Sequence, residues 1–398
     1  MRQRHDEKKK KKKKKGKVGE VRLTSFSRQH RRVDVIFNKV SGRRKPDADS
    51  DIIQSTLQRS FERVVTWHTT EDKCGKAVGE EAIADGATVL IACGGDGTVT
   101  GVATAIQKRV EEEGDGAGDL MLGVVPRGTA NALCNALDIP GNVKRAAEMI
   151  ATGCVRRIDM AQVWGTEGKK RMLLLAGIGL EAETVKGAPR AMKRALGALA
   201  YGVAGIRSIW KQEGFEATVI MHDVLDGKAF AKGQLEAKEM RLGGMVLKGV
   251  TVANAAPATS VLAQGVGTVR PDDGLVEVVC VASQTPWGMM RTMLLMLRSA
   301  LLRRRETRGT VFATRARRVS VQCDPPQRVV VDGEPCGTTP VTVQLGARAD
   351  AVRVIAPKAG AVNRRRRHLS RALIRLWRNA RGAALLAVAI VALRRARA

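Results

Sequence analysis

The stretch Ala87-Thr-Val-Leu-Ile-Ala-Cys-Gly-Gly-Asp-Gly-Thr98 constrains the fold more than any other part of the chain. It begins as a short apolar run rich in β-branched residues, which is typical of a strand buried on both faces. The run ends in three glycines and one aspartate, and a helical pattern follows over Val99–Arg109. Because glycines carry no Cβ, phosphate groups can approach the backbone N–H groups of such a turn closely. The stretch predicts a phosphate-binding turn, and an ordinary strand-to-helix turn is the alternative.

Predicted strands and helices alternate around this turn. The strands are Val33–Val40, Arg63–Thr69, the run that ends at Gly94, and Leu120–Pro126; the helices are Ser50–Phe61, Cys74–Ala84, Val99–Arg109 and one that ends near Leu137. This alternation predicts a parallel sheet covered on both faces, with ligands bound beyond the carboxyl ends of its strands. Polar, glycine-bearing loops at Asn38, Gly95–Thr98 and Gly128–Asn131 follow three of the strands. We therefore expect these loops to converge.

The pattern changes after about Gly153, where short strands separated by turns predominate. The predicted strands are Val155–Trp164, Arg171–Gly177, Glu216–Asp223, Gly249–Ala255, Gly274–Val281, Val319–Cys323, Gln327–Val331 and Val341–Ala356. Helical patterns interrupt them at about 183–212 and 285–305. The pattern predicts a mainly antiparallel second domain. We expect a disordered basic tail over 1–30, an α/β domain over 31–153, a β domain over 154–357 and a C-terminal tail over 358–398.

The two tails carry much of the formal net charge of +30, beginning with the unbroken lysine run Lys8–Lys15. In the C-terminal tail, four arginines recur at helical spacing on one face: Arg371, Arg375, Arg378 and Arg381. The apolar segment 382–393 that follows is too short to span a bilayer, which takes about 20 residues. These features predict an interfacial helix on an anionic membrane surface. The alternative is a helix packed on the protein itself. Nucleic acid is a less suitable partner, because only 3% of residues are aromatic and available for base stacking.

The seven cysteines contain no C-x-x-C pair, which is typical of reduced thiols in a cytoplasmic protein. Together with the tails, this predicts a cytoplasmic protein peripherally associated with a membrane. The sequence leaves a homodimer open.

Two downstream turns carry paired carboxylates. Pro271-Asp-Asp-Gly-Leu275 precedes a strand, and Val330-Val-Val-Asp-Gly-Glu334 ends one. Asp-Gly is a strong hairpin signal by itself. The functional alternatives are a hard-cation site for the first turn and, for the second, a carboxylate that accepts a proton from an attacking hydroxyl. Gly177-Ile-Gly-Leu-Glu-Ala182 matches a dinucleotide fingerprint weakly, because it lies among antiparallel strands.

Four of these motifs, in their order and spacing, resemble the diacylglycerol kinase catalytic-domain family, which includes bacterial lipid kinases and sphingosine kinases. They are Gly94–Thr98, Pro126–Asn131, Asp272–Leu275 and Asp332–Glu334. The resemblance covers about residues 32–357. It implies a three-layer α/β nucleotide-binding domain like that of NAD kinases, followed by a mainly antiparallel β-sandwich. The implied activity is ATP- and Mg²⁺-dependent phosphorylation of a diacylglycerol-like lipid at a membrane surface, which fits a site built for positioning and charge neutralisation.

The resemblance also implies roles for individual residues. Glu334 matches the general base of bacterial members, and Asp96 matches the residue that organises phosphate and the catalytic magnesium. A structural magnesium would lie at Asp273 with carbonyl groups near Arg270 and Leu275. The implied ATP-binding residues are Asn38, Thr70, Gly94, Gly95, Asp96, Gly97, Thr98, Val99, Thr100, Gly101, Gly128, Thr129 and Asn131.

Several positions depart from the family pattern. Thr100 and Gly101 stand where relatives commonly have Asn and Glu, and Ala132 stands where an aspartate is frequent. Lys39 replaces the usual proline after Asn38, and Glu181 replaces an aspartate. These changes remove two carboxylates from the cleft region and leave nucleotide choice and catalytic rate open. The alternatives are a kinase for a sphingoid base, another lipid or a small soluble substrate, or a catalytically weak membrane- or nucleic-acid-binding protein on a kinase scaffold.

Overall fold

The structure is a computed structural model, and it describes residues 32–42, 46–114, 119–180, 182, 213–224, 239–256, 260, 263, 269–282, 285, 287–289, 291–292, 310–346 and 351–358. Three sequence predictions lie almost entirely outside these residues. They are the N-terminal tail, the helical pattern 183–212 and the C-terminal tail with its membrane-associating helix. Only a few positions of the pattern 285–305 are described.

The N-terminal half is built on a six-stranded sheet with the order β2-β1-β3-β4-β18-β5. Neighbouring strands run parallel from β2 to β18, and β5 is antiparallel to β18. Every residue of β3 and β4 is buried, as the apolar run before the glycine turn predicts. The strands are β1 (Arg32–Phe37), β2 (Arg63–His68), β3 (Val89–Gly94), β4 (Met121–Pro126), β5 (Cys154–Ile158) and β18 (Val352–Ala356).

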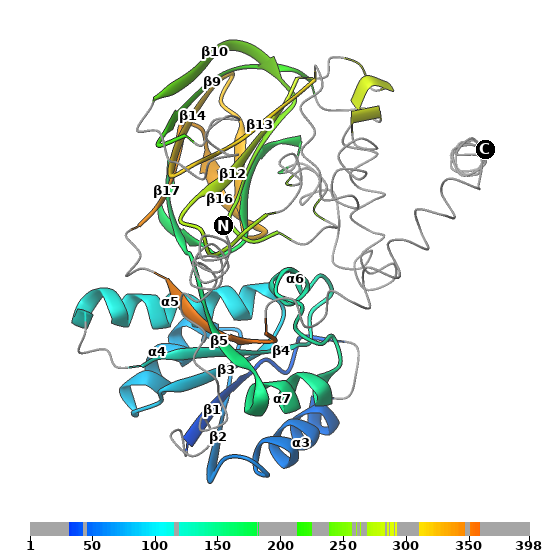
Figure 1. The fold of residues 1–398 in the computed structure, drawn as a ribbon, viewed down its shortest axis with the longest axis vertical. Helices are drawn as coiled ribbons and strands as arrows, with labels where there is room; N and C mark the ends of the chain where they lie inside the picture. Colours follow the sequence, from blue (N-terminus) through cyan, green and yellow to red (C-terminus); the bar gives the residue numbers. More distant parts are fainter. Residues whose placement is uncertain are drawn as a thin grey trace, which may run out of the picture. The chain divides into compact units, whose positions relative to one another are not determined.

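Helices cover both faces of this sheet and complete the predicted three-layer domain. Helices α4 and α5 pack against each other, α3 packs against α7, and the two pairs lie on opposite faces (Figure 1). The α5 helix begins three residues earlier than predicted because Gly95, in an extended conformation, is already its N-cap. The α7 helix was not predicted. The helices are α3 (Pro46–Leu57), α4 (Gly75–Ala84), α5 (Asp96–Glu113), α6 (Ala132–Ala136) and α7 (Val143–Thr152).

Two antiparallel sheets form the predicted sandwich, and one apolar cluster contains side chains from both of them. The first has the order β10-β9-β14-β17-β6-β7, with β10 (Met240–Leu247), β9 (Phe215–His222), β14 (Arg318–Asp324), β17 (Val341–Leu345), β6 (Ala161–Gly165) and β7 (Gly168–Met172). The second has the order β13-β12-β11-β8-β15-β16, with β13 (Val311–Ala316), β12 (Val276–Val281), β11 (Gly249–Ala253), β8 (Leu175–Gly179), β15 (Arg328–Val331) and β16 (Glu334–Thr338).

Three predicted strands are wrong as single strands. Val155–Trp164 divides into β5 and β6, and Val341–Ala356 divides into β17 and β18. In both cases one strand belongs to the parallel sheet and the other to the sandwich. Arg171–Gly177 likewise divides between β7 and β8, in different sheets of the sandwich. Apolar alternation continues across a short turn, and the pattern contains no information about which sheet a strand joins.

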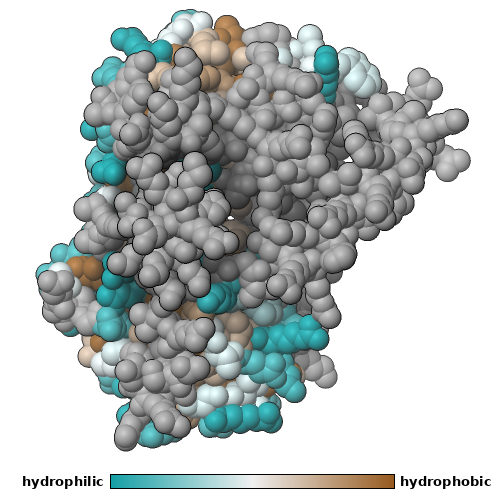
Figure 2. Space-filling view, in the orientation of Figure 1, coloured by the Kyte–Doolittle hydropathy of each residue, from teal (hydrophilic) through white to brown (hydrophobic). Residues whose placement is uncertain are grey.

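In the part of the chain that the structure describes, no helix has the length and apolar character needed to cross a membrane. Hydrophobic residues gather at the top of Figure 2, over β9 and β10, where Val246 is 45% exposed.

Candidate active site

The glycine turn after β3 and the loop after β4 are joined by main-chain hydrogen bonds. The carbonyl oxygen of Gly94 accepts from the N–H groups of Arg127 and Gly128, at 2.9 and 3.1 Å. The N–H of Asn38, after β1, donates to the carbonyl of Cys93 at 2.9 Å. The three loops predicted to converge therefore do so, because β1, β3 and β4 are neighbours whose carboxyl ends lie at one edge of the sheet.

Glycines allow close contacts within the turn after β3 and between that turn and the loop after β4. A Cβ on Gly128 would lie 2.5 Å from the Cα of Gly95, and a Cβ on Gly94 would lie 2.4 Å from the hydroxyl oxygen of Thr98. Contacts this short do not occur with real side chains, so both positions require glycine. The prediction that the glycines after β3 form a turn with an open backbone is consistent with these contacts.

Asn38 joins its own loop to the start of α5. Its amide nitrogen donates to the hydroxyl of Thr98 at 3.1 Å. Its amide oxygen accepts from the N–H groups of Val40 and Ser41, which shapes the loop. One asparagine side chain therefore holds two of the loops in place.

Asp96 lies in the first turn of α5, and its carboxylate points to the start of α6. Its Oδ1 accepts from the N–H of Ala132 at 2.7 Å. Burial raises the pKa of Asp96, while the amides of Ala132, Leu133 and Asn131 lower it. The carboxylate is well placed to order the turn, since it accepts N–H groups at the start of α6 that would otherwise lack partners within the helix.

The other predicted nucleotide-binding residues surround this edge of the sheet. Asn131 adopts a left-handed conformation (φ 45°) as the N-cap of α6, and its amide donates to the carbonyl of Gly128. Thr129 is exposed between them, whereas Val99 is buried in α5. Thr70 closes a turn with Lys73 after β2, the edge strand, and β1 separates it from the glycine turn.

The sandwich domain places Glu334 against the glycine turn after β3. One carboxylate oxygen of Glu334 lies 3.8 Å from the position of a Cβ on Gly97, and the side chain is exposed. Glu334 begins β16 directly after the two-residue turn Asp332-Gly333, where both residues have positive φ. That is the backbone of a tight hairpin, as the Asp-Gly signal predicts. The structure therefore brings Glu334 and the glycine turn together.

Asp332 holds this hairpin and was not among the predicted site residues. Its carboxylate accepts from the N–H groups of Leu173, Leu174 and Leu175 at 2.8–3.0 Å, and from the hydroxyl of Thr100 at 3.2 Å. Burial raises the pKa of Asp332 to about 6, although these hydrogen bonds lower it. Aspartate is common in Asp-Gly turns whatever its other contacts, so no separate signal in the sequence indicates this role.

Two departures from the family pattern have structural explanations. Thr100 supplies the hydroxyl that bonds Asp332 and so connects α5 to the Glu334 hairpin. Gly101 faces the start of α4, where a Cβ would lie 2.8 Å from the backbone nitrogen of Lys76. A glutamate at position 101 would therefore point at α4. It could not restore the acidic group that relatives commonly have there unless a helix moved.

We expect Gly101→Ala to destabilise the protein by about 1–3 kcal/mol, because a methyl group there overpacks two helix backbones. Thermal unfolding measures this effect, and Gly101→Glu should be worse. Gly141→Ala is the matched control, since nothing lies within 4 Å of a Cβ at that position. An unchanged unfolding temperature for Gly101→Ala would contradict the close packing of α4 and α5.

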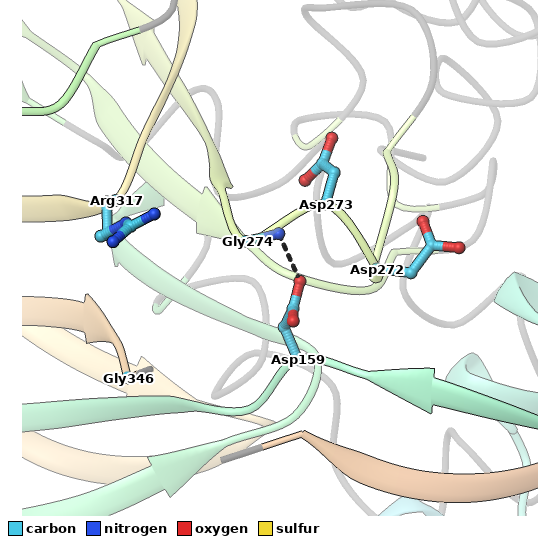
Figure 3. A pocket seen from close by; sticks show the side chains of 6 residues that line it. All are labelled: Asp159, Asp272, Asp273, Gly274, Arg317 and Gly346. Carbon is cyan, nitrogen blue, oxygen red and sulfur yellow. Dashed lines mark hydrogen bonds between the residues drawn. The ribbon is translucent and has the colours of Figure 1, made fainter. Parts of the chain in front are cut away.

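Asp273, one of the three predicted metal ligands, lines a cavity of about 210 Å³, whereas Arg270 and Leu275 are not among its lining residues, which are Asp159, Asp272, Asp273, Gly274, Arg317 and Gly346 (Figure 3). In this view the carboxylates of Asp159, Asp272 and Asp273 lie apart and do not meet at one point. Asp159 accepts from the N–H of Gly274 at 2.7 Å, and Asp273 pairs with the guanidinium of Arg315 at 3.1 Å. Burial raises the pKa of Asp273, while Arg315 and Arg270 lower it.

Arg315 is itself buried and also forms an ion pair with Glu277 at 2.7 Å. Among the described residues, no three His, Cys, Asp or Glu side chains are grouped as metal ligands. A guanidinium in contact with Asp273 fits a divalent cation poorly, so Arg270, Asp273 and Leu275 stay a prediction as metal ligands.

Comparisons with known proteins match both domains of the chain to known families. Residues 32–163 match the family described as "Diacylglycerol kinase catalytic domain", and residues 175–356 match the "YegS C-terminal NAD kinase beta sandwich-like domain". The chain is 35% identical to the uncharacterized protein sll0036 of Synechocystis sp. over 78% of this chain and 67% of that one. It is 26% identical to the diacylglycerol kinase of Bacillus subtilis over 78% of this chain and 92% of that one.

Solved structures share the fold. A diacylglycerol kinase structure from Bacillus anthracis str. Sterne matches with a TM-score of 0.55 and 18% identity, and a second structure from that strain reaches 0.61 and 21%. Each match covers 83% of this chain and 98% of the other. The predicted fold, an α/β domain followed by an antiparallel sandwich, is confirmed. The chain belongs to the diacylglycerol kinase catalytic-domain family of lipid kinases and is therefore a phosphotransferase.

Proposed function

We propose that the protein transfers the γ-phosphate of ATP to a hydroxyl of a diacylglycerol-like lipid, with Mg²⁺, at a membrane surface. The observation that carries the proposal is the position of the Glu334 carboxylate beside Gly97, in the first turn of α5. A carboxylate next to a phosphate-binding turn is suitably placed to accept the proton of an attacking hydroxyl. The family membership supplies the class of reaction.

The residues at the sheet edge divide the work of this reaction. The N–H groups at the start of α5 hold the phosphates, because Gly94, Gly95 and Gly97 leave the backbone open. Glu334 accepts the proton as the lipid oxygen forms its bond to the γ-phosphorus, and the bond from phosphorus to the ADP oxygen breaks. The hydrogen bonds of Asp332 fix the hairpin that carries Glu334. Little covalent chemistry is required of the protein, so positioning is its main contribution.

Asp96 is the residue that would hold a catalytic Mg²⁺. The ion commonly takes one or two carboxylates, with substrate phosphates and waters completing its coordination, and Asp96 supplies one carboxylate at the turn. Its Oδ1 accepts from the Ala132 N–H at 2.7 Å, and an ionised carboxylate has about four lone-pair sites, which leaves room for a cation. Bound there, Mg²⁺ would neutralise charge on the transferring phosphate. Asp273 has no part in this step.

The relatives' names support a lipid as the acceptor. Besides the Bacillus subtilis diacylglycerol kinase, the chain is 25% identical to a protein of Xanthomonas oryzae named "Probable lipid kinase YegS-like", over 62% of this chain and 82% of that one. Sphingoid bases and other lipids are the alternative acceptors.

The proposal is tested by measuring phosphate transfer from labelled ATP to lipids in mixed vesicles. The vesicles carry diacylglycerol, a sphingoid base or neither, with and without Mg²⁺. We expect labelling that depends on diacylglycerol and Mg²⁺. Labelling of the sphingoid base alone would show that a sphingoid base, and not diacylglycerol, is the acceptor. The absence of any labelled lipid under all of these conditions would contradict the proposal.

We further propose that the C-terminal tail carries the protein to anionic membranes, because its arginines, which recur at helical spacing in the sequence, attract acidic headgroups and each contribute on the order of 1 kcal/mol. Deleting residues 364–398 should reduce binding to phosphatidylglycerol vesicles and activity on them. Activity on detergent-solubilised diacylglycerol should change little. An equal loss of activity in vesicles and detergent would show that the tail is part of the folded enzyme instead.

A further inference from the structure

Arg127 lies in the loop after β4, and its side chain contacts two other parts of the N-terminal domain, helix α3 and the end of β1 with the residue that follows it. Nε donates to a carboxylate oxygen of Asp49 in α3 at 3.0 Å, and Nη1 donates to the carbonyl of Asn38 at 2.6 Å. The guanidinium also lies over the ring of Phe37, 4.5 Å from its centre. The side chain is 1% exposed, so these contacts are made away from water.

This arrangement carries a cost in folding stability. The third guanidinium nitrogen, Nη2, is buried and has no hydrogen-bond partner in the part of the chain described. Removing an arginine and an aspartate from water costs free energy that their attraction often fails to recover, and a buried N–H without an acceptor adds to the cost. Apolar side chains would fill the same space at lower cost. Stability alone therefore does not account for an arginine here.

The contacts instead connect Arg127 to the phosphate-binding edge. Its Nη1 holds the main chain of Asn38, and the Asn38 amide holds the hydroxyl of Thr98 in the first turn of α5. The loop after Asn38 also packs on Arg127, because a Cβ on Gly42 would lie 3.0 Å from the Arg127 carbonyl oxygen. The main-chain N–H of Arg127 bonds Gly94. Arg127 thus connects its own loop to the other two loops.

We propose that Arg127 is a positioning residue for the nucleotide site, which acts by holding the Asn38 loop against the start of α5. The proposal rests on the proposed function in that the bound ligand is ATP. The Asp49 carboxylate, in α3, orients the guanidinium through the hydrogen bond from Nε at 3.0 Å. Loss of the Nη1 contact frees the Asn38 loop and weakens ATP binding without removing any group that touches ATP.

The experiment separates this role from a structural one. Arg127→Met alone leaves Asp49 buried without its partner and should lower the unfolding temperature strongly. The double variant Arg127→Met with Asp49→Asn removes both charges, so its unfolding temperature should return toward that of the wild type. Its Kd for ATP, measured by calorimetry, should nevertheless stay raised by about tenfold or more, as expected for a lost hydrogen bond to a charged group. Asp49→Asn alone keeps the Asn38 contact and should bind ATP with near wild-type affinity.

The outcomes are distinct. A double variant that is folded and binds ATP as the wild type does would overturn the proposal, even if lipid phosphorylation is established. A raised Kd in the double variant together with a normal Kd in Asp49→Asn supports it, even if the lipid acceptor proves different from diacylglycerol. A wild-type protein that binds no ATP would overturn this proposal and the proposed function together.

Discussion

Glu334→Gln is expected to lower kcat by about 10²–10⁴-fold, the range that a positioned general base contributes. The amide cannot accept the proton of the lipid hydroxyl, so the loss falls on the chemical step. The KM for ATP and the unfolding temperature should change little, because the Glu334 side chain is exposed and the hairpin is held by Asp332. Steady-state kinetics with diacylglycerol vesicles, together with thermal unfolding, measure these quantities.

The matched control is Glu216→Gln, on the exposed side of β9. It removes the same charge from the sandwich lobe without touching the hairpin or the glycine turn, and it should keep wild-type kcat. If Glu334→Gln keeps kcat within about threefold of wild type, Glu334 is not the base, since a lost general base costs far more than that. A fall in ATP affinity with unchanged kcat would show that Glu334 acts in nucleotide binding instead.

The sequence predicted the N-terminal lobe well because its strongest signals are local. An apolar run followed by glycines identifies a strand and its turn without reference to the rest of the chain, and β3 followed by α5 confirms that turn. Parallel topology then follows from the alternation of strands and helices, which places Asn38 beside Thr98 although 60 residues separate them. The sequence alone therefore predicts that the three loops converge.

Signals that depend on partners distant in the chain were less accessible. The β5 and β18 strands pair with each other in the N-terminal sheet, although the sandwich strands lie between them in the sequence. No local pattern indicates that these two strands belong to that sheet and not to the sandwich. Asp332 and Arg127 sit in turns whose residue types already have a local explanation, so their longer contacts are not visible in the sequence. The α7 helix, in contrast, did carry a signal: an Asn142 N-cap precedes apolar residues at helical spacing.

The glycine packing at the sheet edge gives the second large expected effect. Gly128→Ala would place a methyl group 2.5 Å from the Cα of Gly95 and 3.0 Å from the amide oxygen of Asn131. The added methyl carbon is fixed to the main chain of residue 128 and its neighbour is a main-chain atom of Gly95, so one loop must move away from the other. We expect a loss of stability of about 1–3 kcal/mol from overpacking. We also expect ATP affinity to fall at least tenfold, because Gly95 is the N-cap of the helix whose N–H groups hold phosphate.

Gly141→Ala separates this effect from a general cost of replacing glycine. No atom lies within 4 Å of a Cβ at Gly141, so that variant should match the wild type in unfolding temperature and in the Kd for ATP measured by calorimetry. If Gly128→Ala lowers stability but leaves the Kd unchanged, the two loops can separate without disturbing the nucleotide, and phosphate must be held elsewhere. If stability and ATP affinity both fall, the close approach of Gly95 and Gly128 is what shapes the phosphate site.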